Sequence, residues 1–324
     1  MEWLPLSAAS NQRFGRSGML HIRNPVEWGV DQIRFAGAAM ARPRAAPDLT
    51  PGVRRLSVAD LAQALARGID DFAAFRSDVV FIALIYPLAG LVLVRLVFGY
   101  GLLPLIFPLV SGFALIGPIA AVGLYEMSRR RESGMEAGWA DAIGVVRAPA
   151  FGSIVLFGGL LLAIFLVWLV IALAIYHATL GPAPSADRAA ALALYDATFG
   201  PGSALSPSGF AYNVFETPAG WTLIGVGVGI GFLFAVFVLA IGVVSVPAML
   251  DRDVGLFAAI GTSLRVVRRN PGVMALWGLI VAAALAIGSI PLFLGLIVVM
   301  PVLGHATWHL YRRAVVPPPL PEDA

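Results

Sequence analysis

The chain has 324 residues, of which 59% are hydrophobic and only 13% are charged, with a formal net charge of +3. A soluble domain carries about 25% charged residues, so a soluble core of this size could not bury the apolar surplus, which requires lipid. The absence of cysteine excludes disulfides, thiolate metal sites and a cysteine nucleophile. All 22 basic residues are arginine. We attribute this preference for arginine over lysine to a GC-rich bacterial genome. The basic pI of about 9.6 is typical of a membrane protein that keeps Arg on the cytoplasmic side, and we expect no nucleic-acid partner.

The N-terminal segment, residues 1–55, is expected to be a largely disordered cytoplasmic tail. A short helix near 25–40 is the exception, because Asn24 suits an N-cap and Pro25 suits the first helical position. This tail has no apolar segment typical of a signal peptide, so we expect the first span to act as its own insertion signal. Residues 314–324 are expected to form a disordered C-terminal tail.

An amphipathic helix is predicted directly before the first span. Ser57 and Asp60 form a capping-box pattern at its start. Apolar side chains then recur at helical spacing, which predicts one apolar face. They are Leu61, Leu65, Ile69, Phe72 and Phe75. The pattern predicts that this helix ends near 76–78.

Long uncharged segments predict the membrane spans. Residues 150–186, 217–250 and 272–311 contain no Asp, Glu or Arg. About 20 residues cross a hydrocarbon core of about 30 Å. The sequence therefore predicts an all-α, polytopic transmembrane bundle over residues 56–313. Its six spans are placed near 79–99, 102–124, 150–176, 221–247, 272–288 and 291–311.

Charge placement predicts the orientation of these spans. With both termini in the cytoplasm of a bacterium, 20 of the 22 arginines fall on the inner side of the inner membrane. Only Arg188 lies outside, and Arg95 is the one arginine within a span. The arginines next to the inner ends of the spans are expected to anchor the protein at anionic lipid. These anchors are Arg129, Arg130, Arg131, Arg268, Arg269, Arg312 and Arg313.

An internal repeat divides the chain into three units, which begin near 57, 135 and 254. Gly68 precedes Arg76-Ser77-Asp78 by the same spacing with which Gly261 precedes Arg269-Asn270-Pro271. Each unit is predicted to be an amphipathic cytoplasmic helix followed by a two-span hairpin. The middle hairpin has a long outer loop, residues 177–220. Repeats of this kind frame a pathway in many transporters, but duplication produces them without a pathway as well.

Three motifs carry a family resemblance over roughly 55–313. They are Gly117-Pro118-x4-Gly123-Leu124-Tyr125-Glu126-x2-Arg129-Arg130, Leu250-Asp251-Arg252-Asp253 and Pro301-Val302-Leu303-Gly304-His305-Ala306-Thr307-Trp308-His309. They resemble the bacterial domain of unknown function 2189 family, whose members are described as integral membrane proteins and in some cases labelled cytochrome-oxidase-like. The resemblance implies no established functional residues. The four histidines are too few for a haem–copper oxidase core.

The clearest candidates for a chemical site are His305 and His309. Their i, i+4 spacing puts both imidazoles on one helix face, within reach of one metal ion or one haem edge. Glu126 or Asp251, from the inner ends of other spans, could complete a metal site. The alternative is that the imidazoles bind neighbouring helices or lie in the interfacial belt, and that Glu126 pairs locally with Arg129 and Arg130.

Four glycines, Gly225, Gly227, Gly229 and Gly231, resemble a phosphate-binding loop. They lie inside an apolar span, whereas a phosphate-binding loop lies between a strand and a helix, so a phosphate-binding role is excluded. Small residues four apart let helices approach closely, so helix packing is the expected role. The partner helix could belong to the same chain or to a second copy in a homo-oligomer.

Three function hypotheses follow from these patterns. The leading one is a non-enzymatic structural or assembly factor of the inner membrane, with no cofactor, because no catalytic set, nucleotide loop or buried charge array stands out in the sequence. The second is a small transporter or channel built on the hairpin repeats, which predicts a polar cavity at mid-membrane. The third is a haem- or metal-binding subunit that uses His305 and His309.

Overall fold

The computed structural model describes residues 51–316, except residues 84, 100–101, 182–185, 201–205 and 292. These residues are helical almost throughout, which confirms the all-α class. The short helix predicted near 25–40 lies outside the described residues, as does most of both predicted tails.

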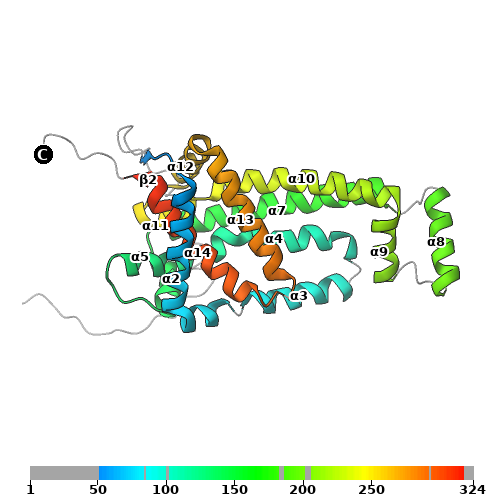
Figure 1. Ribbon diagram of the computed structural model, residues 1–324, viewed down its shortest axis with the longest axis horizontal. Helices are drawn as coiled ribbons and strands as arrows, with labels where there is room; N and C mark the ends of the chain where they lie inside the picture. The colour runs from blue at the N-terminus through cyan, green and yellow to red at the C-terminus, as the bar shows by residue number, and fades with distance from the viewer. Residues whose placement is uncertain are drawn as a thin grey trace, which may run out of the picture.

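Long helices lie along the longest axis of the molecule (Figure 1). α7 and α10 are side by side, α3 and α4 run beside them, and α13 is inclined to them. Three stretches in the described part of the chain are long and apolar enough to cross a membrane: Phe151–Thr179, Pro218–Arg252 and Pro271–Ser289. The helices of this group are α3 (Ile85–Gly99), α4 (Ile106–Ala120), α7 (Phe151–Thr179), α10 (Pro218–Gly242) and α13 (Pro271–Ser289).

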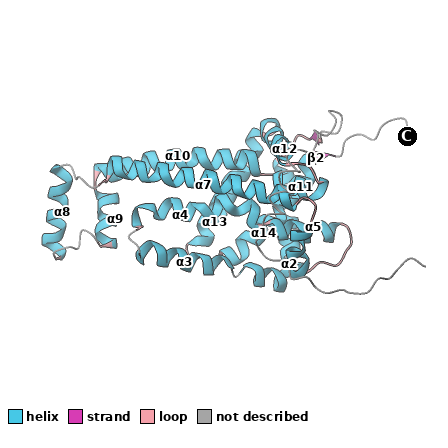
Figure 2. Ribbon diagram, turned by 180° about the vertical axis from the view of Figure 1, so that it is seen from behind, coloured by secondary structure: helices cyan, strands magenta, loops and turns pink. Residues whose placement is uncertain are grey.

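A second group of helices gathers at one end of this axis, with α2 lying across it (Figures 1 and 2). We call this group the polar layer, because it holds the ion pairs described below. It contains α2 (Val58–Ala83), α5 (Val122–Glu132), α11 (Ser245–Arg252), α12 (Leu256–Arg269) and α14 (Leu296–Ala314). α6 (Trp139–Gly144) and the 3-10 turns Leu103–Leu105 and Val145–Arg147 are short connections.

Two helices lie at the opposite end, where a long loop was predicted over 177–220. They are α8 (Ala186–Phe199) and α9 (Pro207–Glu216). Thr217 explains the sharp corner between α9 and α10. Its hydroxyl donates to the Asn213 carbonyl at 2.6 Å and accepts from the Gly220 amide at 3.0 Å, so it ends one helix and caps the next.

The two ends of the described chain meet at the polar layer. β1 (Gly52–Val53) pairs antiparallel with β2 (Val315–Val316), so four residues from the predicted tails form a small strand pair. Asn270, at the end of α12, accepts from the Leu56 amide at 2.7 Å and donates to the Arg54 carbonyl at 3.1 Å. The predicted capping box of α2 is confirmed, because the Ser57 amide donates to Asp60 and the Asp60 amide donates to the Ser57 hydroxyl.

Close glycine contacts place α14 between α2 and α5. A Cβ added at Gly68 on α2 would lie 2.7 Å from the backbone nitrogen of Ala306 and 2.8 Å from the carbonyl oxygen of Val302. On the other side of α14, a Cβ at Gly304 would lie 2.6 Å from the side chain of Leu124. At Gly68 the close atoms belong to the backbone of α14, so only glycine permits this approach of α14 to α2.

The predicted apolar face of α2 is confirmed except at one position. Leu61 is buried and Leu65, Phe72 and Phe75 pack against the core, whereas Ile69 is 53% exposed. The buried face also includes Ala64, Gly68 and Asp71. This face follows the contact with α14, and it includes a carboxylate that the apolar pattern could not indicate.

The predicted span boundaries agree with the structure only in part. α7 and α13 match the expected spans 150–176 and 272–288 closely. α2 continues as far as Ala83, so the predicted span 79–99 is divided between α2 and α3. The final segment differs most, because α14 begins only at Leu296 and its C-terminal half packs in the polar layer.

An extended apolar surface surrounds α7 and α10. On α7 it includes Leu162, Leu166, Val167 and Val170, and on α10 it includes Phe232, Leu233, Val236 and Phe237, all at least 45% exposed. Soluble monomers rarely expose contiguous apolar patches of this extent, whereas lipid-facing helices require them. We call these exposed side chains of α7 and α10 the lipid-type surface.

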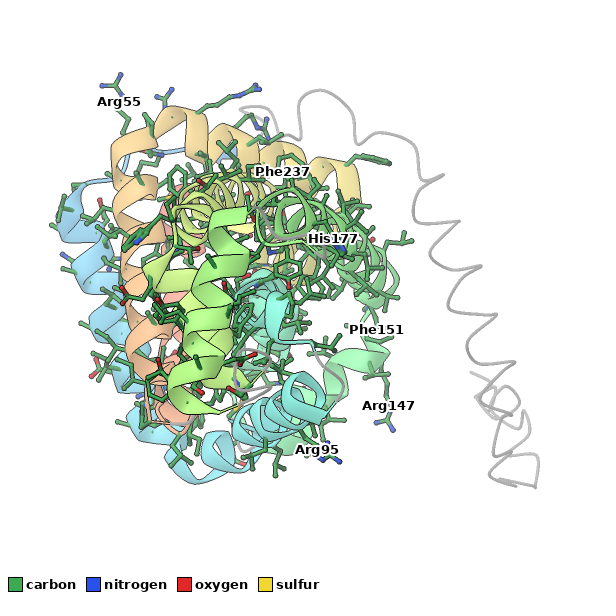
Figure 3. All side chains as sticks on the ribbon, turned by 90° about the vertical axis from the view of Figure 1, so that its right-hand side faces the viewer. Arg55, Arg95, Arg147, Phe151, His177 and Phe237 are labelled. Atoms are coloured by element: carbon green, nitrogen blue, oxygen red, sulfur yellow. The ribbon has the colours of Figure 1, made fainter. Side chains whose placement is uncertain are left out.

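Figure 3 views the molecule from the α8–α9 end and shows Arg95 and Arg147 projecting away from the helices.

Candidate functional site

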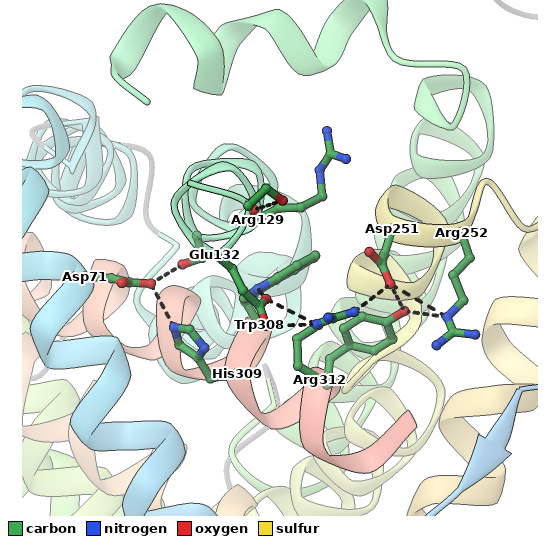
Figure 4. Close-up of polar contacts among 11 residues, drawn as sticks. Asp71, Arg129, Glu132, Asp251, Arg252, Trp308, His309 and Arg312 are labelled. Carbon is green, nitrogen blue, oxygen red and sulfur yellow. Dashed lines mark hydrogen bonds and ion pairs between the residues drawn. The ribbon is translucent and has the colours of Figure 1, made fainter. Parts of the chain in front are cut away.

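The two candidate histidines meet an aspartate in the polar layer. Nε2 of His309 lies 2.8 Å from Oδ2 of Asp71, which belongs to α2 (Figure 4). The Ser128 hydroxyl, from α5, donates to the same oxygen at 2.6 Å and lies 2.7 Å from Nδ1 of His305. Arg131 binds the other carboxylate oxygen at 2.6 Å. The site therefore joins α2, α5 and α14.

The hydrogen-bond partners indicate where the protons of this site lie. Because the Ser128 hydroxyl donates its single proton to Asp71, its oxygen can only accept from Nδ1 of His305. His309 likewise donates from Nε2 to the carboxylate. The nitrogens left over, Nε2 of His305 and Nδ1 of His309, have no hydrogen-bond partner among the described residues.

All four uncharged and acidic members of the site are buried: His305 and Ser128 are 0% exposed, Asp71 5% and His309 6%. Burial raises the pKa of the Asp71 carboxyl, but hydrogen bonds from His309 and Ser128 outweigh it and hold the pKa below its ordinary value. Asp71 is therefore a buried carboxylate whose charge is compensated by donors from two other helices.

The site borders a cavity of about 230 Å³ at the surface of the polar layer. Asp71, Ser128 and His309 form its floor, and Arg67, Asp70, Arg131 and Glu132 form its remaining walls. The cavity is lined by two arginines and three carboxylates, so groups of both charges face it.

Glu126 and Asp251, the two carboxylates predicted to complete a metal site, lie in other networks. Glu126 accepts from Arg129 at 2.7 Å and from Arg130 at 3.0 Å, which is the local pairing given above as the alternative. Asp251 accepts from the Tyr311 hydroxyl at 2.7 Å and pairs with Arg312 at 3.5 Å. In the part of the chain that the structure describes, no group of three or more His, Asp or Glu side chains is arranged to hold a metal ion.

A second cluster fastens α14 to α5 and α11. Glu132 accepts from the Trp308 indole at 3.0 Å and pairs with Arg312 at 3.1 Å. Arg252 donates to the Tyr311 hydroxyl at 3.0 Å (Figure 4). Burial and the neighbouring Asp251 carboxylate together favour a neutral, hydrogen-bonding Tyr311, which is buried completely.

The predicted arginine anchors fall into two classes. Arg129, Arg130, Arg131, Arg312 and Arg313 form ion pairs with carboxylates of the layer. Arg268 and Arg269, at the end of α12, are exposed and have no ion pair within the described residues. The second class is therefore the more available to a charge outside the protein.

The four glycines of α10 also divide. A Cβ at Gly231 would lie 3.2 Å from the Trp168 ring of α7, so this glycine lies in a helix–helix contact. A Cβ at Gly225, Gly227 or Gly229 would meet no described atom within 4 Å. Of the four glycines, only Gly231 therefore makes a close contact with another described helix.

Sequence reasoning missed Asp71 and Ser128, which form the centre of the site. Asp71 could have been noticed, because it is a charged residue three positions after Gly68 and so lies on the same helix face, the one that contacts α14. Ser128 gave no signal, because a serine within a helix is ordinarily unremarkable.

The helical fold and the lipid-type surface define the class of this molecule: an all-α integral membrane protein. The family model described as "Predicted integral membrane protein (DUF2189)" matches residues 106–192 and 188–251. It is the family that the sequence motifs resemble, so that resemblance is confirmed. The chain matches no curated protein and no solved structure.

Proposed function

We propose that the protein is a non-enzymatic structural or assembly factor of the bacterial inner membrane. In this role the polar layer forms a rigid platform on the cytoplasmic leaflet, and the long helices anchor it in the bilayer. No cofactor belongs to this function.

The observation that carries the proposal is how the carboxylates of the layer are used. Each of five carboxylates is bound by donors, and together they connect α2, α5, α11 and α14. Asp71 alone joins three helices that are 57 to 238 residues apart in the chain. A network with these partners fixes the relative positions of helices. The five are Asp60, Asp71, Glu126, Glu132 and Asp251.

The same contacts support six spans in three hairpins. Asp71 before α3 and Arg131 after α4 touch, so the chain between them leaves the layer and returns. α7 leaves from the layer and α11 returns to it, and α13 leaves from α12 before α14 returns. Each departure and return is one hairpin. Because α3 and α4 have 15 residues each, about 22 Å, they cross only if α2, α5 or a thinned bilayer supplies the remainder.

Arg268 and Arg269 support contact with anionic lipid at the layer. Both are exposed at the C-terminal end of an amphipathic helix that buries Leu256, Ala259 and Val266. A basic residue near an anionic leaflet contributes about 1 kcal/mol. The protein is therefore expected to be more stable in anionic than in zwitterionic lipid.

Thermal unfolding of the full chain in lipid nanodiscs tests this proposal. We expect phosphatidylglycerol to raise the melting temperature above the value in phosphatidylcholine, and Arg268→Glu/Arg269→Glu to remove most of that rise. Arg268→Lys/Arg269→Lys keeps the charge and should retain it. An equal rise in all three proteins would contradict the lipid contact, and solute flux through reconstituted wild-type protein would contradict the structural role.

The two alternatives have different support. For a transporter, the larger cavity described below is apolar rather than polar, which favours the structural role. The haem- or metal-binding alternative has one observation in its favour, the bare acceptor nitrogens of His305 and His309. Metal analysis and an absorption spectrum of the purified protein distinguish it from the proposal.

A further inference from the structure

A second, larger cavity lies at the opposite end of the long helices from the polar layer. It occupies about 460 Å³ between α4, α7, α9 and α10. Volumes of this size are typical of sites for small ligands. Phe107 comes from α4, Trp168 and Ala172 from α7, Phe210 from α9 and Gly227 from α10.

The walls of this cavity are apolar throughout. Every residue that lines it is a glycine, proline, alanine, valine, leucine, isoleucine, phenylalanine or tryptophan. The one side-chain donor among them, the Trp168 indole, lies 3.2 Å from the Ser111 hydroxyl and is already used. Water needs two to four polar partners to occupy a cavity, and no side chain in these walls offers a free one. Walls of this composition favour an aliphatic occupant.

The cavity is a built feature of the fold rather than a gap between mobile segments. α9 is fixed against α10 by the Thr217 hydroxyl and by Gly220, where an added Cβ would lie 2.2 Å from the Val214 carbonyl oxygen. Trp168 is 1% exposed and packs on Phe234 with ring centroids 5.4 Å apart. One wall is therefore held by a turn and another by an aromatic contact.

The mouth of the cavity is continuous with the lipid-type surface. Phe107 is 50% exposed, Val228 50% and Phe215 57%, and each also lines the cavity. Trp221, 60% exposed, lies beside it at the start of α10, in the position that aromatic residues take at a membrane interface. An occupant thus enters from the bilayer and not from water.

We propose that this cavity binds one acyl chain of a membrane phospholipid, in the leaflet next to α8 and α9. The chain fills the space between α4, α7 and α10, and α9 covers it from the side of the head groups. The inference is independent of the proposed structural role, because it uses none of the polar-layer residues.

Gly227 and Gly225 provide a matched pair of variants. Both lie on α10, and an added Cβ at either would meet no described atom within 4 Å, so a side chain can begin at both without a clash. Only Gly227 lines the cavity. Gly227→Leu should therefore fill the cavity and exclude the chain, whereas Gly225→Leu should place the same side chain on the helix exterior.

Quenching of tryptophan fluorescence by brominated acyl chains tests the proposal. The full chain is reconstituted in vesicles of phosphatidylcholine with dibrominated chains, and the Trp168 signal is obtained by subtracting Trp168→Phe in each background. We expect strong quenching of Trp168 in the wild type and in Gly225→Leu, and at least a twofold loss of quenching in Gly227→Leu. Equal quenching in the two leucine variants would overturn the proposal.

Native mass spectrometry of protein extracted in mild detergent gives a second measurement. The wild type and Gly225→Leu should retain one more phospholipid than Gly227→Leu, with melting temperatures in detergent confirming that all three are folded. Retention of a lipophilic molecule of another mass, or of a second copy of the chain that Gly227→Leu releases, would identify a different occupant and reject the phospholipid.

Discussion

At the scale of single residues, Asp71 shows how one buried charge can organise several helices. Its carboxylate accepts from Ser128, His309 and Arg131, so its desolvation is compensated by donors from α5 and α14. Hydrogen bonds to charged groups contribute about 1.5–3 kcal/mol, and a donor left without its acceptor costs a further desolvation term. The site therefore links the stability of the layer to a single side chain.

Replacing Asp71 should destabilise the protein much more than replacing its neighbour. Asp71→Ala leaves Ser128 and His309 without their acceptor, so we expect a loss of about 1.5–3 kcal/mol in the free energy of unfolding. Asp70→Ala is the control, because Asp70 is exposed. Denaturant unfolding in detergent micelles measures both. Equal effects for the two aspartates would mean that the buried network contributes no special stability.

At the scale of helices, the contact between α2 and α14 depends on Gly68. The internal repeat aligns Gly68 with Gly261, yet their surroundings differ. An added Cβ at Gly68 would lie within 3 Å of the α14 backbone, while one at Gly261 on α12 would meet no described atom within 4 Å. The two glycines that the predicted repeat aligns therefore have different surroundings.

These two glycines should respond oppositely to alanine. Gly68→Ala forces α14 away from α2, and overpacking of this kind costs about 1–3 kcal/mol. Gly261→Ala adds no clash and should stabilise α12 by up to about 1 kcal/mol, the difference in helix propensity. Melting temperatures in one detergent provide the comparison. A stabilised Gly68→Ala would contradict the close packing described here.

At the scale of the whole molecule, the paired strands constrain the topology. Val53 pairs with Val315, so we expect the described chain to begin and end on the same side of the membrane and to cross it an even number of times. Three helical stretches are long and apolar enough to cross a membrane. An even number of crossings then predicts at least one further crossing by the shorter helices.

Cysteine labelling decides how many crossings there are. The chain has no native cysteine, so single variants report one position each. Six spans place Ser133→Cys and Ala258→Cys on one side of the membrane and Ala190→Cys on the other. Ile290→Cys, 79% exposed between α13 and α14, should react from the same side as Ala190→Cys. Reaction from the side of Ser133→Cys would mean that the last hairpin does not cross.

The sequence alone determined the chemical class, the lipid-facing helices and the capping of α2. These features follow from local composition: long uncharged runs predict spans, and Ser57 with Asp60 predicts a reciprocal cap. The family resemblance rests on contiguous motifs and was equally accessible. The possible homo-oligomer stays a prediction, since the exposed positions Gly225 and Gly229 are compatible with it.

Only the tertiary structure decided which residues meet. The i, i+4 spacing places His305 and His309 on one face but cannot show that the opposing carboxylate is Asp71, 238 residues from His309, rather than Glu126 or Asp251. Likewise, the sequence places both Arg131 and Arg268 next to spans, and only packing shows that Arg131 is paired with Asp71 whereas Arg268 is exposed. Local patterns fix periodicity and solvent preference, whereas partners depend on how helices cross, for example on the close approach of the α14 backbone to Gly68.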